Sequence, residues 1–242
     1  MTARRAARQD VVAVLETQDV EVLGLLPYSS NYVFLARVGS EEEGVLAIYK
    51  PTRGERPLWD FPPGTLAARE AAAYVVSEAG GWRFVPPTVL RSDGPLGAGS
   101  LQLFIEHDPE RHYFVLLEER RDEFASVATF DIVVNNADRK AGHVLEDRDG
   151  RLWGVDHGLT FNEDPKLRTV IWDFAGTDVP HDSLVQLETL LAAFDDGDVV
   201  TRLEGLLAPR EIDETRRRLE ALLADPIFPE PTSRHHLPWP LV

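Results

Sequence analysis

The stretch from Phe130 to Phe161, FDIVVNNADRKAGHVLEDRDGRLWGVDHGLTF, decides the fold and locates the candidate site. Its first part continues an apolar helix, predicted over 124–134, that breaks at Asn135. Two short strands, predicted over 143–146 and 152–156, follow as a hairpin. Charged side chains therefore gather on a loop between a helix and a hairpin, and loops held by a rigid scaffold are where chemistry is usually placed.

The spacing of these charged residues matches the needs of phosphoryl transfer. That reaction needs a carboxylate to orient the attacking hydroxyl, a cation near the γ-phosphate of ATP, and side chains that hold Mg²⁺. In protein kinases the catalytic Asp precedes a metal-binding Asn by five positions, and a second metal-binding Asp lies on a later hairpin. Here Asp138 precedes His143 by five positions, Lys140 lies between them, and Asp156 lies on the next hairpin. The four residues together predict a phosphotransferase site.

Two segments, NNADRKAGHVL (135–145) and WGVDHGLTF (153–161), resemble the catalytic and metal-binding loops of the atypical kinase group. That group contains the phosphatidylinositol 3- and 4-kinases and the HipA-type bacterial kinases. The chain is most similar to an actinobacterial family described as phosphatidylinositol-kinase-like, in which YKPxRGERPLWDFPxGTL and NNADRKxGH recur. The resemblance covers nearly the whole chain. It implies an α+β, two-lobed atypical protein/lipid-kinase-like fold, with a small β-rich N-lobe and a mainly helical C-lobe.

The resemblance also implies a role for each residue of the loop. Asp138 is expected to orient or deprotonate the acceptor hydroxyl, and Lys140 to neutralise the γ-phosphate. His143 and Asp156 are expected to hold Mg²⁺ or Mn²⁺, although most of the kinase group has Asn where this chain has His143. Two more residues are expected to brace the loop: Arg139 and Asp131.

Lys50 and Glu70 are the predicted ion pair of the nucleotide site. Lys50 ends a strand predicted over 44–50, and the following helix, predicted over 64–78 with Thr65 as a possible cap, carries Glu70. The strand resembles the V-A-I-K strand of kinases, whose Lys binds the α- and β-phosphates and pairs with a helix Glu. A lone Lys at a strand end is usually solvated, and the following helix favours the pair instead.

Two further segments are expected to border the cleft. The turn between strands predicted over 20–25 and 32–38 offers backbone N–H groups and polar side chains to the ATP phosphates, and an ordinary hairpin turn is an equal alternative. Its predicted nucleotide contacts are Ser29, Ser30 and Asn31. The segment 51–63 either covers the cleft, shapes a substrate site or packs through Trp59.

A hinge is predicted after the strand over 100–106, with adenine bonded to its main chain. The predicted hinge contacts are Phe104, Ile105 and Glu106. The hinge divides the chain into a nucleotide-binding N-lobe, 1–106, and a C-lobe, 107–242, that holds the catalytic and metal loops and a Pro-rich tail. Helices of the C-lobe are predicted over 118–134, 164–172, 182–194, 196–207 and 211–224.

Composition narrows the choice of partners. The chain has 242 residues, a net charge of −16 and no Cys, which excludes disulfides and thiolate metal sites and fits a cytoplasmic protein. No apolar run approaches the roughly 18 residues of a membrane span. Strong negative charge disfavours nucleic acid and stable association with anionic membranes, and it counts against a membrane phosphoinositide as the acceptor.

Three functions are consistent with these observations. The preferred one is an ATP-dependent kinase that acts on a hydroxyl of a protein or a small molecule. The second is a nucleotide-binding pseudokinase or an AMP-transferring enzyme, since a glycine-rich loop is missing and His143 replaces Asn. The third is a metal-dependent hydrolase that uses His143, Asp156 and His157, although adjacent strand residues point to opposite faces.

Overall fold

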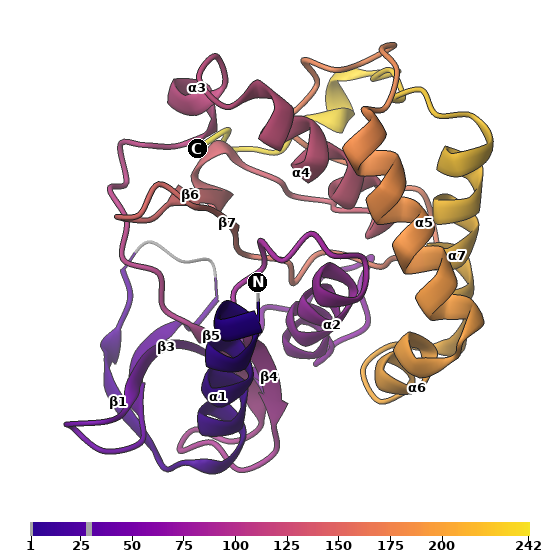
Figure 1. The fold of residues 1–242 in the computed structure, drawn as a ribbon. Coiled ribbons are helices and arrows are strands. Elements are labelled where there is room, and N and C mark those ends of the chain that lie inside the picture. Colours follow the sequence, from indigo (N-terminus) through magenta and orange to yellow (C-terminus); the bar gives the residue numbers. More distant parts are fainter. Residues whose placement is uncertain (1, 28–30) are drawn as a thin grey trace.

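A five-stranded antiparallel sheet forms the N-terminal part of the computed structural model, which describes residues 2–27 and 31–242 (Figure 1). The spatial order is β1-β2-β3-β5-β4, so β5 lies between β3 and β4. The strands are β1 Val20–Leu25, β2 Phe34–Val38, β3 Val45–Pro51, β4 Thr88–Arg91 and β5 Gly99–Leu103. All five match strands predicted from the sequence, including one over 88–91, and the largest difference is the earlier end of β5.

The two faces of β3 contact different surroundings. Ala47 and Tyr49 are fully buried and pack with Leu15 of helix α1, Thr2–Thr17. Because successive side chains of a strand point to opposite faces, Lys50 points away from the α1 side of the sheet. The alternation of β3 therefore presents Lys50 to the rest of the molecule.

Helix α2, Leu66–Ala79, lies between the sheet and the C-terminal helices (Figure 1). Its residues 72–76 belong to the large hydrophobic core that also contains α4 and α5. Thr65 does not cap the helix as predicted: its hydroxyl donates to the carbonyl of Pro62, and Oε1 of Glu55 accepts the N–H of Ala67 over 3.0 Å. A carboxylate near a helix N-terminus is favourable, so the segment before α2 supplies the cap.

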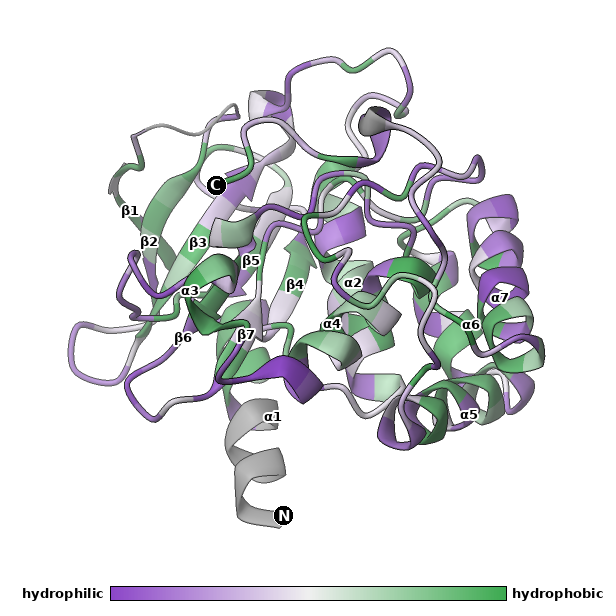
Figure 2. Cartoon of the chain, turned by 90° about the horizontal axis from the view of Figure 1, so that it is seen from above, coloured by the Kyte–Doolittle hydropathy of each residue, from purple (hydrophilic) through white to green (hydrophobic). Residues whose placement is uncertain are grey.

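The C-terminal part contains five helices and a short hairpin among the described residues. The helices are α3 Tyr113–Leu116, α4 Arg121–Val133, α5 His181–Asp195, α6 Asp198–Glu204 and α7 Pro209–Ala224. The hairpin pairs β6, Val144–Glu146, with β7, Leu152–Gly154. Along α7 hydrophobic and hydrophilic residues mix (Figure 2), and Ile212, Leu219 and Leu222 form its buried stripe at helical spacing.

The helix predicted over 164–172 is absent from the structure, and that prediction was wrong. The backbone that follows Pro165 bonds with the loop after α4, residues 135–143, instead of with itself. The N–H of Arg168 donates to the carbonyl of Asn136 over 2.8 Å, and the N–H of Val170 donates to the carbonyl of Arg139 over 3.0 Å. These long-range bonds replace the helical ones.

The α+β organisation is confirmed, whereas a division at residue 106 stays a prediction. The sheet and α1 have a small core of their own, but α2 shares the core of the C-terminal helices. Across the described parts of the chain, no helix combines the length and the apolar character needed to cross a membrane.

Candidate active site

Lys50 lies between two carboxylates that come from distant parts of the chain. Its Nζ pairs with Oε1 of Glu70 and donates to Oδ1 of Asp156 over 2.9 Å. Burial disfavours the charged ammonium, but the carboxylates of Asp156 and Glu70 outweigh it and raise the pKa of Lys50. The predicted pair of Lys50 and Glu70 is therefore formed, and Asp156 completes it.

Glu70 connects the lysine to the chain that follows Asp156. The Glu70 side chain is almost fully buried, and its Oε2 accepts the backbone N–H of His157 over 3.0 Å. One carboxylate thus orders both the cation of β3 and the backbone beside the predicted metal ligand. Burial raises the pKa of Glu70, and Lys50 acts in the opposite direction.

Asp138 lies on the catalytic loop with its carboxylate partly accessible. Its backbone N–H donates to Oδ1 of Asn136 over 3.0 Å, and its Oδ2 lies 3.1 Å from Nζ of Lys140. Burial raises the pKa of Asp138, while Lys140 lowers it. A partly desolvated carboxylate beside a cation can accept a proton from a hydroxyl, which is the chemistry expected of a general base.

Arg139 is fully buried and holds the catalytic loop together. Its guanidinium makes two bonds to Asp131, of 2.9 and 2.8 Å. It also donates to the carbonyls of His143 and Val155, over 3.2 and 3.0 Å, and lies 2.7 Å from Nε2 of His157. One side chain therefore ties α4, the catalytic loop and the end of the hairpin together, which is the bracing arrangement expected for Arg139 and Asp131.

Asp156 and His143 lie next to each other. Asp156 has a φ of 59°, in the left-handed region that non-glycine residues seldom adopt and that clusters at functional sites. Its Oδ2 lies 3.2 Å from Nε2 of His143. Lys50 is the main cause that holds the pKa of Asp156 far below its usual range. Burial lowers the pKa of His143 to about 4, so its ring is neutral at pH 7.

Asp156 is the carboxylate at which a divalent cation would bind, and such binding stays a prediction. Mg²⁺ is commonly held by one or two carboxylates together with substrate phosphates, and within the described chain no three His, Cys, Asp or Glu side chains gather as a metal site. The Nδ1 of His143 accepts the N–H of Lys140 over 3.4 Å, so Nε2 carries the ring proton. Ligation by His143 stays a prediction, and it requires that proton to move from Nε2 to Nδ1.

A cavity of about 320 Å³ lies beside Lys50. Lys50, Glu70, Asp138 and Asp156 all line it. Both segments expected to border the cleft contribute to the rest of the wall: Asn31 comes from the turn, and Glu55, Arg56 and Leu58 come from 51–63. The side-chain oxygen of Asn31 accepts the N–H of Arg56 over 2.9 Å and so joins those segments. The predicted contacts Ser29 and Ser30 lie outside the described residues.

The segment 51–63 contributes residues whose individual roles the sequence did not specify. Trp59 is 92% exposed, so this segment does not pack through that residue. Phe61 is the buried aromatic side chain, and Glu55 both caps α2 and lines the cavity. The only signal in the sequence for Glu55 and Phe61 is the motif YKPxRGERPLWDFPxGTL, which this chain shares with the family that it resembles.

The predicted hinge residues contact the β6–β7 hairpin and the sheet. The N–H of Phe104 donates to the carbonyl of Leu46 over 2.9 Å, Ile105 packs in a cluster with Leu145 and Trp153, and Glu106 pairs with Arg148. None of the three lines the cavity beside Lys50, and adenine binding to this segment stays a prediction.

The hydrolase hypothesis loses one of its three residues. His157 is fully buried, and its ring lies beside Arg139 and packs against Phe84 and Phe130. The side chain of Asp156 is half exposed and faces Lys50 instead. The two adjacent side chains diverge, so His157 does not join a metal shell with Asp156.

Solved structures share this fold. The chain matches a structure of hydra Fam20 with sugar at a TM-score of 0.56 and 14% identity, over 90% of this chain and 88% of that one. It also matches the Helicobacter pylori proinflammatory kinase CtkA at a TM-score of 0.55 and 10% identity, over 88% and 94% of the two chains. The two-lobed kinase-like α+β fold is confirmed.

Sequence comparison identifies the family. Protein Rv2133c of Mycobacterium tuberculosis is 38% identical over 268 aligned residues, which cover 96% of each chain. Phosphatidylinositol 4-kinase gamma 4 of rice is 32% identical over 127 residues, or 45% of this chain and 22% of the rice protein. The resemblance to HipA-type kinases stays a prediction. The family model for phosphatidylinositol 3- and 4-kinases matches residues 67–198, from α2 through the loops of the site to the start of α6. The chain therefore belongs to the phosphatidylinositol 3- and 4-kinase family.

Proposed function

We propose that this protein is an ATP-dependent phosphotransferase that acts on a hydroxyl group. The observation that carries the proposal is the cavity lined by Lys50, Glu70, Asp138 and Asp156. A cation held between two carboxylates and a separate, partly accessible carboxylate are the parts that phosphoryl transfer needs. Kinase-type relatives and a kinase-type fold support the same conclusion.

The residues divide into a nucleotide side and an acceptor side. Lys50 binds the α- and β-phosphates, Glu70 keeps it in place, and Asp156 holds Mg²⁺ or Mn²⁺. When bound, that cation neutralises charge on the phosphate oxygens. Asp138 takes the proton of the acceptor hydroxyl, and the oxygen of that hydroxyl attacks the γ-phosphorus. The bond between the γ-phosphorus and the bridging oxygen breaks, and ADP leaves. Lys140, 3.1 Å from Asp138, neutralises charge on the transferred group.

The acceptor that we propose is a hydroxyl of a protein or a small molecule. The rice relative is named as a phosphatidylinositol 4-kinase, and this chain shares the family. Its net charge of −16 repels the anionic surface on which phosphoinositides lie, and also nucleic acid. We therefore propose ATP and a free or protein-bound hydroxyl as its partners, without stable membrane association.

The products formed from ATP test the proposal. The purified chain is incubated with ATP and Mg²⁺ or Mn²⁺, with Asp138→Asn as the control, and ADP and pyrophosphate are measured separately. We expect ADP, with release greatly reduced in the control. Pyrophosphate would instead identify an AMP-transferring enzyme, and ATP binding without either product would identify a pseudokinase.

A further inference from the structure

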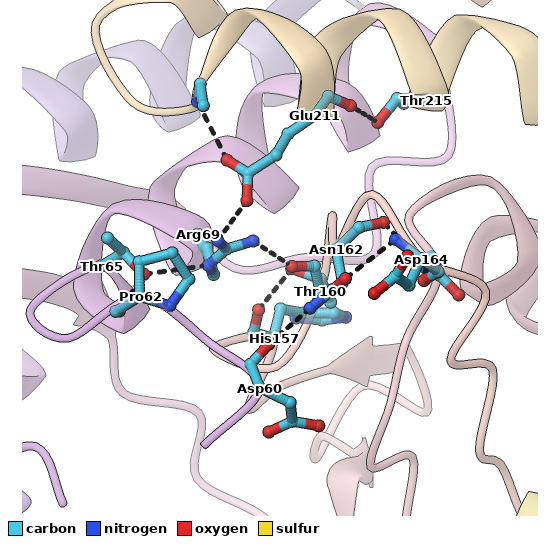
Figure 3. A network of polar contacts seen from close by, with 12 residues as sticks. Asp60, Pro62, Thr65, Arg69, His157, Thr160, Asn162, Asp164, Glu211 and Thr215 are labelled. Atoms are coloured by element: carbon cyan, nitrogen blue, oxygen red, sulfur yellow. Dashed lines mark hydrogen bonds and ion pairs between the residues drawn. The ribbon is translucent and has the colours of Figure 1, made fainter. Parts of the chain in front are cut away.

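Arg69 precedes Glu70 on α2 and is a fully buried arginine that the proposed reaction does not use. Its three nitrogens reach three different elements (Figure 3). Nε donates to Oγ1 of Thr65 over 3.2 Å, Nη1 donates to the carbonyl of Thr160 over 2.5 Å, and Nη2 pairs with Glu211. The start of α2, the chain after Asp156 and the start of α7 therefore meet at one guanidinium.

Glu211 is held in place by its own helix before it meets Arg69. It lies in the first turn of α7, and its Oε2 accepts the N–H of Ala208 over 2.9 Å. A glutamate at this position satisfies a backbone N–H that the helix leaves free, and it restricts its own side chain. Its second oxygen, Oε1, is then directed to Arg69 (Figure 3). The partner of Arg69 is thus a fixed carboxylate.

Arg69 and Glu70 hold the two ends of one short turn. Glu70 accepts the N–H of His157 over 3.0 Å, and Arg69 donates to the carbonyl of Thr160. Within that turn the hydroxyl of Thr160 donates to the carbonyl of His157 over 2.6 Å. The position of α2 and the conformation of the backbone beyond Asp156 are therefore coupled through two neighbouring helix residues.

The segment before α2 is fixed at the same junction. The ring of Phe61 lies 5.1 Å from the guanidinium carbon of Arg69, and Nδ2 of Asn162 donates to the carbonyl of Asp60 over 2.7 Å. Removing one partner of a buried ion pair leaves an uncompensated charge, which is strongly unfavourable. α2 therefore cannot move away from α7 without leaving Arg69 or Glu211 buried and unpaired.

We propose that Arg69 and Glu211 are positioning residues: their buried pair ties α2 to α7 and so keeps Glu70 in contact with Lys50. This inference rests on the proposed function insofar as Lys50 binds ATP. Neither Arg69 nor Glu211 lines the cavity that Lys50, Glu70, Asp138 and Asp156 share, so the pair acts from outside it. The ion pair of Arg69 and Glu211 keeps Lys50 and Glu70 in contact before a nucleotide binds.

The test is Glu211→Gln, with Glu220→Gln as the matched control. Glu220 lies on the same helix and pairs with Arg216 at the surface, so both variants remove one charge of an ion pair from α7. We expect Glu211→Gln to weaken ATP binding about tenfold by calorimetry, equivalent to 1.4 kcal/mol, and Glu220→Gln to leave it unchanged. Arg69→Lys keeps the charge without the planar fork, and an intermediate loss is expected.

A double-mutant cycle separates positioning from a general loss of stability. If Glu211 acts through Glu70, Glu211→Gln has little further effect on ATP affinity in a Glu70→Gln background. An equal loss in both backgrounds would overturn the proposal. Amide hydrogen exchange of 66–79 provides a readout without nucleotide, and we expect it to be faster in Glu211→Gln than in Glu220→Gln.

The two proposals fail in different ways. A wild-type chain that does not bind ATP contradicts the proposed function, and the tie is then judged by hydrogen exchange alone. Faster exchange of α2 in Glu211→Gln supports the tie in that case. Exchange equal to that of the Glu220→Gln control overturns it.

Discussion

The catalytic loop and the junction between α2 and α7 are each built around a fully buried arginine. Arg139 pairs with Asp131, eight positions away, and its other partners, His143, Val155 and His157, all lie within the next 18 residues of the chain. Arg69 pairs with Glu211, 142 positions away, and with the carbonyl of Thr160. The first arginine closes a local structure, whereas the second joins parts of the chain that only the complete fold brings together.

This difference predicts which property each region controls. The loop around Arg139 carries Asp138, the base that we propose for the acceptor hydroxyl, while the junction around Arg69 carries Glu70, which pairs with Lys50. Changes in the loop should therefore reduce turnover, and changes at the junction should reduce nucleotide affinity. Each of the following experiments either sharpens that division or breaks it.

The largest effect is expected for Asp138→Ala. Loss of a general base costs about 10²–10⁴-fold in turnover, whereas ATP affinity should be nearly unchanged, because the proposed role of Asp138 is toward the acceptor and not the nucleotide. Asp156→Ala should lose metal-dependent ATP binding as well. Calorimetric titration of both variants, together with product formation, checks this. Equal loss of ATP binding in the two variants contradicts the assignment of their roles.

The next largest effect is expected on the free energy of unfolding, when the buried pair of Arg139 and Asp131 is broken. Arg139→Leu or Asp131→Leu leaves one buried charge without its partner, which typically costs about 3–5 kcal/mol in the free energy of unfolding. The double variant should recover part of that loss, since no unpaired charge remains. Chemical denaturation of the three variants measures it. A double variant no more stable than the singles would show that the pair does not act as a unit.

The same contrast explains what the sequence could predict. Asp138, His143 and Asp156 follow each other on one helix–loop–hairpin, so their spacing alone brought them to one place. Lys50 and Glu70 required only a strand end and the next helix. The partner of Arg69 depends on how α7 docks, and no local pattern specifies that.

The mistaken helix over 164–172 has the same origin. Its backbone bonds to Asn136 and Arg139, about 30 residues earlier, and such pairing overrides local helical preference. Asn31 was reached through its position in the predicted turn, but the role of Glu55 was not, because its contacts form only once α2 is in place. Local sequence patterns indicated the candidate site residues, whereas the residues that support them are specified by long-range contacts.

A smaller effect, on ATP affinity, is expected for changes to the ion pair of Lys50 and Glu70. Lys50→Met should weaken ATP binding strongly and Glu70→Gln less, because in the proposed function the lysine binds the phosphates and the glutamate acts through the lysine. Contacting residues usually show coupling of about 0.5–3 kcal/mol in a double-mutant cycle. Calorimetric affinities of the singles and the double variant give that coupling. Strictly additive losses would show that the ion pair does not contribute to ATP binding.

His143 tests whether the loop also supplies a metal ligand. If its imidazole ligates metal, activity should prefer Mn²⁺ over Mg²⁺, because nitrogen is a softer ligand than a carboxamide oxygen. His143→Asn should then restore the use of Mg²⁺. Activity of both proteins is measured across the two metals. An unchanged preference would assign His143 to orienting Asp156, with which it now shares a 3.2 Å contact.

The smallest effect concerns stability against pH, measured without metal or nucleotide. Burial lowers the pKa of His143 from its usual 6.5 to about 4, so between these values the unfolded chain binds a proton that the folded chain does not. Stability therefore falls as pH drops from 6.5 toward 4, by at most about 1.4 kcal/mol per pH unit for this group. His157, whose pKa burial also lowers, and Glu70 titrate in both proteins. Denaturation of wild type and His143→Asn across this range isolates the contribution of His143. We expect the variant to have the shallower dependence, and parallel curves would mean that His143 protonates as readily in the folded loop as in the unfolded chain.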